Sequence, residues 1–130
     1  LNLNDQVICL DYLNNDEIRN LYKNCKALVM PSLVGYSSLP LYEAFYYKKP
    51  VFYTKDLLDT SLKGFVSEID IENPASLAEQ IINFDKNIQK IEEKTTIANQ
   101  YFIKNLSDEK IRSNYIGLFK KLQNLIKLYK

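Results

Sequence analysis

The first half of the chain alternates short apolar runs with amphipathic segments. Residues 7–10 and 27–30 are apolar tetrads, and a third apolar run at 50–54 begins with a proline. An uninterrupted apolar run is typical of a strand that is covered on both faces, and proline is tolerated at the first position of a strand. The pattern therefore predicts three strands joined by helices, in a Rossmann-like parallel sheet of the α/β class with helices on both faces.

Caps and helical spacing indicate where the intervening helices lie. Asn14 or Asn15 caps the first helix, and Glu17 is placed for a capping box if Asn14 is the cap. A second helix is predicted at 39–47. The predicted inward face of the first helix comprises Ile18, Leu21, Tyr22 and Cys25.

The second half of the chain predicts one more short strand and three helices. Residues 63–67 predict an edge strand, and Asn73-Pro74 begins a helix. Longer helices are predicted at 86–103 and from a cap at Ser107 onward, and the apolar stripe of the last helix is wider than one small sheet needs. The predicted inward residues are Leu77, Ala78, Ile81 and Ile82, then Ile88, Ile91, Thr95, Ala98 and Phe102, and finally Ile111, Tyr115, Leu118, Phe119, Leu122, Leu125 and Ile126.

Composition narrows the classes of protein that remain. A chain of 130 residues with 46% hydrophobic side chains is expected to bury one core, and a net charge of +1 with both signs spread along it argues against a nucleic-acid partner. The lack of histidine excludes Ser-His and Cys-His triads and most zinc sites. Cys9 and Cys25 stand in apolar patterns and are expected to be small core residues. No apolar run reaches the ~20 residues of a membrane span, and we expect a cytoplasmic chain.

The stretch 31–44 leaves a predicted strand, crosses a turn of small residues and enters a helix. A helix start leaves about four backbone N–H groups unpaired and carries partial positive charge, so this geometry suits an anion such as phosphate. Glu43 stands one turn into the helix, where a carboxylate can accept from a sugar hydroxyl. Spacing alone favours a plainer interpretation, in which the serines cap the helix and Glu43 interacts with its dipole.

The order of four dipeptides resembles a family signature. Pro31-Ser32, Leu39-Pro40, Glu43-Ala44 and Pro50-Val51 match the signature of retaining glycosyltransferases of the glycogen-synthase and phosphatidylinositol-mannosyltransferase type. The chain thus resembles the donor-nucleotide-binding part of a group 1, family 4 type glycosyltransferase with the GT-B fold.

One position departs from the signature. Gly35 stands where most members carry the first Glu of a paired-Glu motif, and Tyr36-Ser37-Ser38 replaces a Gly-Phe-Gly run. The departure is similar to a sub-pattern of the superfamily in which Gly-Pro-Thr-Asn precedes Leu-Pro and only the second Glu is kept. Three outcomes stay open: a different donor sugar, a compensating group from Tyr36 or Ser37, or a degenerate enzyme.

The resemblance covers roughly residues 7–83 and implies a C-terminal GT-B domain that is truncated at its N-terminus and ends in long helices. Residues 1–84 would form a partial nucleotide-sugar-binding domain. Residues 85–130 would be helices that pack on it and on a missing N-terminal, acceptor-binding domain of the same enzyme. The fragment alone is expected to be inactive. Any peripheral association with the inner face of the membrane is expected only through the missing domain.

The candidate site lies where ligands bind such a sheet, outside the carboxyl ends of the strands. The loops after Leu10, Met30 and Thr54 should therefore line one cleft. The resemblance implies that Glu43 holds the ribose hydroxyls of the donor. The candidate diphosphate-binding residues, through backbone N–H groups and the serine hydroxyls, are Tyr36, Ser37, Ser38 and Leu39.

Asp11 and Tyr12 fall where the base-binding loop of the family lies, and Tyr12 is placed to stack on a nucleobase. The aromatic residues Tyr42, Phe45 and Tyr46 are interpreted as packing residues rather than a sugar platform. No metal or cofactor is expected, since the nucleotide-diphosphate sugar is the substrate.

The first functional hypothesis is a hexosyl-type glycosyltransferase that acts in polysaccharide or glycolipid assembly, with retention. The alternative is a non-catalytic nucleotide-binding or partner domain of the same fold, as the loss of a Glu at Gly35 suggests. An unrelated receiver-like domain is disfavoured, because Met30-Pro31 ends the second predicted strand where a phosphorylatable Asp would be needed.

Overall fold

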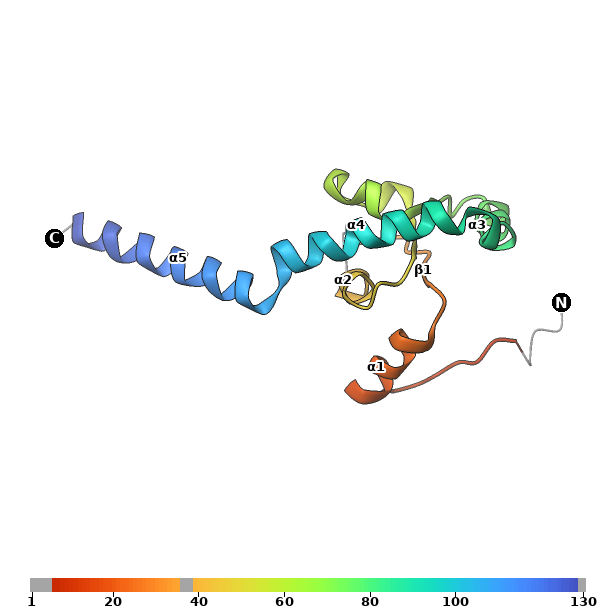
Figure 1. Cartoon of the computed structure of the whole chain (residues 1–130), viewed down its shortest axis with the longest axis horizontal. Helices are drawn as coiled ribbons and strands as arrows, with labels where there is room; N and C mark the ends of the chain where they lie inside the picture. Colours follow the sequence, from red (N-terminus) through yellow and green to blue (C-terminus); the bar gives the residue numbers. More distant parts are fainter. Residues whose placement is uncertain (1–5, 36–38, 129–130) are drawn as a thin grey trace.

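A small parallel sheet forms the centre of the computed structural model, which describes residues 6–35 and 39–128 (Figure 1). Its strands are β1 (Leu28–Met30), β2 (Val51–Thr54) and β3 (Ser67–Ile69), in the order β1-β2-β3. Both pairings are parallel. Helix α2 (Leu39–Tyr46) connects β1 to β2, so the predicted strand–helix–strand unit around the signature is confirmed.

The central strand β2 is buried on both faces, as its apolar sequence predicts. Val51 and Tyr53 belong to the main apolar cluster, which includes Leu41 and Phe45 of α2. Phe52 points the opposite way and lies against Phe84, with ring centroids 6.2 Å apart. The sheet is therefore covered by α2 on one face and by the segment around Phe84 on the other.

Helix α1 (Asn15–Asn24) precedes β1 and is capped at both ends. The Asn14 side chain accepts from the backbone N–H groups of Asp16 and Glu17, and the Glu17 carboxylate accepts from the Asn14 N–H, which confirms the predicted capping box. At the other end the Lys49 ammonium donates to the carbonyls of Lys23 and Cys25. A positive charge thus lies at the carboxyl end of α1, where the helix dipole is negative, and it binds carbonyls that the helix leaves unpaired.

The connection from β2 to β3 is made of two 3-10 helices, η1 (Lys55–Leu57) and η2 (Thr60–Phe65). The edge strand predicted at 63–67 is therefore wrong in position, since β3 begins only at Ser67. Asp59 caps η2 by accepting from the Ser61 N–H, and Leu62 is fully buried. These local contacts keep the chain helical up to Phe65.

Helix α4 (Ile88–Leu106) follows α3 (Pro74–Ile82) and η3 (Asp85–Asn87) and packs on α2 and η2. Its inward positions Ile91, Thr95 and Ala98 are buried, as predicted. Asn99 adds a contact that periodicity does not reveal: its side-chain amide donates to the carbonyls of Phe45 (2.9 Å) and Tyr46 (3.2 Å). Helix α4 therefore supplies a hydrogen-bond donor to carbonyls that the carboxyl end of α2 leaves unpaired.

The predicted buried stripe of α3 is wrong. Ala78, Ile81 and Ile82 are exposed, Leu77 is half-buried, and no residue of α3 is fully buried. Helix α3 meets β3 through its polar side: the Gln80 amide donates to the Glu68 carbonyl, and the Ser76 hydroxyl accepts from the Asp70 N–H. Ser76 and Gln80 are four residues apart and share one face, so the apolar face points outward.

The predicted first strand at 7–10 is also wrong. These residues have no regular secondary structure and are exposed, Ile8 to 81%. An apolar tetrad is stable in a parallel sheet only when both of its faces are covered. The described residues provide no such cover on this side, and Val29 of β1 is itself exposed. Cys9, expected in the core, is consequently an exposed free thiol, whereas Cys25 is a half-buried free thiol.

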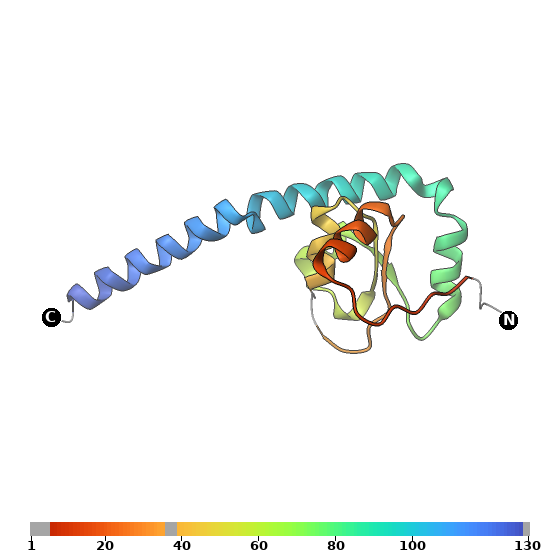
Figure 2. The same cartoon turned by 90° about the horizontal axis from the view of Figure 1, so that it is seen from below.

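Helix α5 (Asp108–Leu128) extends away from the rest of the molecule in both views (Figures 1 and 2). It begins after Ser107, as predicted, and none of its residues is buried. The wide apolar stripe predicted for it is therefore present but uncovered. Among the described helices none is long and apolar enough to cross a bilayer.

Candidate functional site

The carboxyl ends of all three strands lie at one edge of the sheet, where parallel α/β sheets bind their ligands. Thr54, the last residue of β2, fixes the loop that leaves β1. Its hydroxyl donates to the Ser32 carbonyl (2.9 Å) and lies 3.4 Å from the Met30 carbonyl, and the side chain is buried. This buried hydrogen bond holds the first residues of the signature loop against the sheet.

Gly35 has a φ of +101°, a backbone conformation that L side chains rarely adopt. A Cβ built at this position would have no atom within 4 Å. The requirement for glycine is therefore conformational rather than steric. A side chain at Gly35, including the Glu that most members carry there, would therefore strain the backbone of this turn.

The residues that follow the turn belong to the start of α2. The candidate diphosphate-binding residues Tyr36, Ser37 and Ser38 lie outside the described residues. Leu39 is the first residue of α2, and its side chain is 72% exposed. The role assigned to these four residues stays a prediction.

Glu43 is half-buried on the second turn of α2 and faces α1. Burial, together with the adjacent Glu43 carboxylate, raises the pKa of Tyr22. The Tyr22 hydroxyl also donates to the Pro40 carbonyl in the first turn of α2. A shallow cavity of about 230 Å³ opens here, lined by Asn15, Ile18, Arg19, Tyr22, Glu43 and Tyr47. Glu43 therefore stands beside a polar hollow large enough for part of a small ligand.

Asp11 and Tyr12 do not line this cavity. Both are exposed, Tyr12 to 87%, in the segment that leads to the Asn14 cap of α1. The structure brings Asn15, three residues after Tyr12, to the cavity wall beside Glu43. The assignment of Asp11 and Tyr12 to base binding stays a prediction.

The expectation that Tyr42, Phe45 and Tyr46 serve packing is consistent with their surroundings. Phe45 is buried, and its ring meets those of Tyr42 and Phe65 edge to face. Tyr46 is more exposed but lies against Tyr47 and Phe102. These rings pack α2 against η2 and α4 and so fix the position of the helix that carries Glu43.

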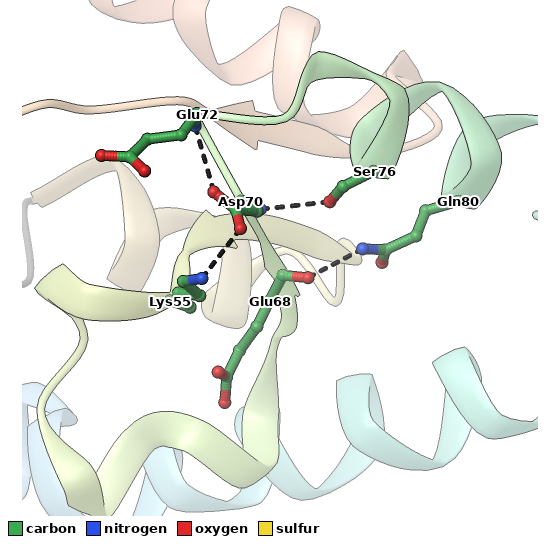
Figure 3. A network of polar contacts seen from close by, with 6 residues as sticks. All are labelled: Lys55, Glu68, Asp70, Glu72, Ser76 and Gln80. Atoms are coloured by element: carbon green, nitrogen blue, oxygen red, sulfur yellow. Dashed lines mark hydrogen bonds and ion pairs between the residues drawn. The ribbon is translucent and has the colours of Figure 1, made fainter.

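An ion pair at the same edge of the sheet was missed by the sequence reasoning (Figure 3). Lys55 directly follows β2, Asp70 directly follows β3, and their charged groups are 2.8 Å apart. The Lys55 ammonium lowers the pKa of Asp70, and Asp70 in turn raises the pKa of Lys55. Asp70 also accepts from the Glu72 N–H, which shapes the loop before α3. The signal in the sequence was the position of each residue immediately after a strand.

A second cavity, of about 300 Å³, lies elsewhere in the molecule. It is lined by Phe52, the first residues of β3, and side chains of α3, η3 and α4, including Lys90 and Lys94. Lys94 donates to the Val66 carbonyl, and burial lowers its pKa. Because its wall includes Ser67, at the amino end of β3, we consider this cavity separate from the edge that carries the signature loop.

Among the described residues, no group of three or more acidic, cysteine or histidine side chains is arranged to hold a metal ion. The chain matches no curated protein and no solved structure. It does match the family model described as glycosyl transferases group 1, over residues 1–87 of the 130. That match spans β1, the signature loop, α2 and the rest of the sheet, and so the chain belongs to the group 1 glycosyltransferases.

Proposed function

We propose that the loop after β1 and the first turns of α2 bind the diphosphate and ribose of a nucleotide-activated sugar. The observation that carries this proposal is the turn at Gly35, which lies between β1 and α2. The Thr54 hydroxyl holds the loop before this turn, and Glu43 lies on the second turn of the helix after it. The backbone N–H groups and the partial positive charge of a helix start suit a diphosphate. Glu43, half-buried beside a polar hollow, suits the ribose hydroxyls.

The proposed reaction is transfer of a hexosyl-type group to a polysaccharide or glycolipid acceptor, with retention. Donors aimed at the diphosphate would stabilise the charge that develops on the leaving group as the sugar becomes cation-like. We assign no general base among the described residues, and no metal is part of the proposal.

We further propose that residues 1–84 are the donor-binding portion and that an N-terminal domain of the same enzyme binds the acceptor. The 130-residue chain by itself would then bind nucleotide without catalysing transfer. In the complete enzyme the reaction would take place in the cytoplasm, where nucleotide sugars serve as donors.

A second candidate function rests on Gly35. A Glu at this position in the family contacts the donor sugar, and loss of a buried, charge-assisted contact costs about 2–3 kcal/mol. The positive φ of Gly35 makes recovery of such a contact by simple substitution costly. This observation favours a non-catalytic nucleotide-binding or partner domain that keeps the fold and the diphosphate site.

Calorimetric titration of the chain with uridine, guanosine and adenosine diphosphates tests the proposal. We expect one of the three to bind weakly. Glu43→Gln should weaken that binding about ten-fold or more, because a charge-assisted hydrogen bond contributes at least ~1.5 kcal/mol. The matched control is Glu79→Gln, an exposed glutamate of α3. Equal affinity of Glu43→Gln and the control would remove Glu43 from the site.

Transfer itself is tested with the full-length enzyme and a labelled nucleotide sugar. Product formation supports the glycosyltransferase. Nucleotide binding without any transfer to polysaccharide or glycolipid acceptors supports the non-catalytic alternative.

A further inference from the structure

The cavity between β3, α3 and α4 lies apart from the proposed donor site. Its volume of about 300 Å³ is at the lower end of the range for small-molecule sites. Strand β3 begins with Ser67 in the cavity wall and is followed by Asp70 at the donor edge, so the two places lie at opposite ends of this strand. We call it the α4 cavity; its polar lining residues are Ser67, Glu68, Gln80, Asn87, Lys90 and Lys94.

Two cations of helix α4 line this cavity. Lys90 and Lys94 are four residues apart and therefore share one face of the helix, where like charges repel each other. Lys94 is half-buried, and its ammonium donates to the Val66 carbonyl at 2.8 Å. Among the residues that the structure describes, no carboxylate forms an ion pair with either lysine. Two neighbouring positive charges therefore line one hollow.

The acidic side chain of Glu68 belongs to the same wall and points away from Asp70 (Figure 3). Burial, together with the charge of Lys90, lowers the pKa of Lys94, and the Glu68 carboxylate opposes this shift without cancelling it. One carboxylate against two ammonium groups leaves the wall with a net positive charge. The α4 cavity therefore favours an anion.

Hydrogen-bonding groups for a second part of a ligand accompany the two cations. The amide N–H groups of Gln80 and Asn87 donate to the carbonyls of Glu68 (2.7 Å) and Asn83 (3.1 Å). These bonds orient both side chains and leave their amide oxygens as acceptors. The Ser67 hydroxyl can both donate and accept. Such groups suit the hydroxyls of a small polar molecule.

We propose that the α4 cavity binds a small phosphomonoester that also carries hydroxyl groups. Near pH 7 such a phosphate carries a charge of about −1.5 to −2, which two lysines match better than they match the single charge of a carboxylate. The phosphate contacts the ammonium groups of Lys90 and Lys94, and the hydroxyls contact Ser67, Gln80 and Asn87. This ligand is distinct from the nucleotide-activated donor, and the family match ends at residue 87, before both lysines.

An internal ion pair between Glu68 and one of the lysines is the alternative. Such a pair would leave the second lysine uncompensated in the same wall. The two possibilities predict opposite effects of Glu68→Gln. Loss of the carboxylate should strengthen the binding of a phosphate, because a like charge is removed from beside it. Loss of a required ion pair should instead lower the thermal stability of the chain.

Calorimetric titration of the 130-residue chain with glycerol 3-phosphate tests the proposal without any nucleotide. We expect D-glycerate, which carries a carboxylate in place of the phosphate ester, to bind more weakly, and glycerol not to bind. Lys90→Gln, at an exposed position, should weaken binding of glycerol 3-phosphate about ten-fold, because a charge-assisted contact is lost. Glu68→Gln should strengthen it about two- to five-fold. The matched control is Lys104→Gln, an exposed lysine near the other end of α4, which should leave the affinity unchanged.

Amide correlation spectra of the ¹⁵N-labelled chain locate the ligand. Glycerol 3-phosphate should shift the resonances of Ser67, Gln80, Lys90 and Lys94 and leave that of Gly35 unchanged. A nucleoside diphosphate is expected to shift the resonance of Gly35, so failure of one site can be distinguished from failure of the other.

Four results would overturn the proposal. The first is no binding of glycerol 3-phosphate, and the second is equal affinity of Lys90→Gln and Lys104→Gln for it. The third is equal affinity for D-glycerate and glycerol 3-phosphate, which would remove the preference for a phosphate. The fourth is weaker binding together with a lower thermal midpoint for Glu68→Gln, which would assign the lysines to an internal ion pair.

Discussion

Helices α4 and α5 are consecutive, similar in length and similarly amphipathic, yet only α4 packs on α2 and η2. Helix α4 buries Ile91, Thr95 and Ala98 against α2 and η2, and its Asn99 satisfies two backbone carbonyls at the end of α2. Helix α5 buries no residue at all. An apolar stripe therefore predicts that one face of a helix will be buried, but it does not say against which element. For α4 that element is identified by a specific contact, the hydrogen bonds from Asn99 to the end of α2.

Truncation of an aromatic side chain should give the largest difference in stability between the packed region around α4 and the exposed helix α5. Phe45→Ala removes a fully buried ring that joins α2 to η2 and should cost about 3–5 kcal/mol in the free energy of unfolding, enough to unfold much of the chain. Phe119→Ala, the matched change on α5, should stay within about 0.5 kcal/mol. Urea denaturation measures both, and a large loss for Phe119→Ala would mean that α5 is packed in solution.

Removal of an asparagine should give a smaller contrast of the same kind. Asn99→Ala leaves the Phe45 and Tyr46 carbonyls without their donor and should cost about 1–3 kcal/mol. Asn114→Ala on exposed α5 should be neutral or slightly stabilising, since alanine is the better helix former. Comparable stabilities of the two variants would contradict the role of Asn99 as the link between α4 and α2.

Glycine substitution should have the smallest effects, with opposite signs in the two regions. Gly35→Ala and Gly35→Glu place a side chain at φ +101° and should each cost about 1 kcal/mol or more. Gly117→Ala, in the middle of α5 and with equally open space, should increase helix content. Thermal melts followed by circular dichroism report both. In the full-length enzyme, Gly35→Glu with higher transfer and unchanged stability would show that the loop is an ordinary one that lacks its Glu.

Local signals predicted much of the fold. The apolar run at β2, the capping box at Asn14 and the proline at the start of α3 act over a few residues, and each lies where the sequence placed it. The predictions for residues 7–10 and for the apolar stripe of α3 were wrong, because burial depends on which other segment packs over an apolar face. Neither the tetrad nor the stripe determines that segment.

The candidate site divides in the same way. The turn at Gly35 and the start of α2 followed from the signature spacing. Thr54 and the Lys55–Asp70 pair were missed, because their roles depend on strand neighbours that lie 15 or more residues apart in sequence. The placement of Glu43 beside Tyr22 likewise arises from the packing of α1 on α2.

The central claim is that the edge of the sheet around the Gly35 turn binds a nucleoside diphosphate. The most direct measurement is a titration of the ¹⁵N-labelled chain with uridine, guanosine and adenosine diphosphates, followed by amide correlation spectra. The account predicts that one nucleotide shifts the amide resonances of residues 35–39 and of Glu43, and leaves those of α5 unchanged. Shifts confined to the cavity around Lys90 and Lys94, or no shift with any of the three nucleotides, would contradict it.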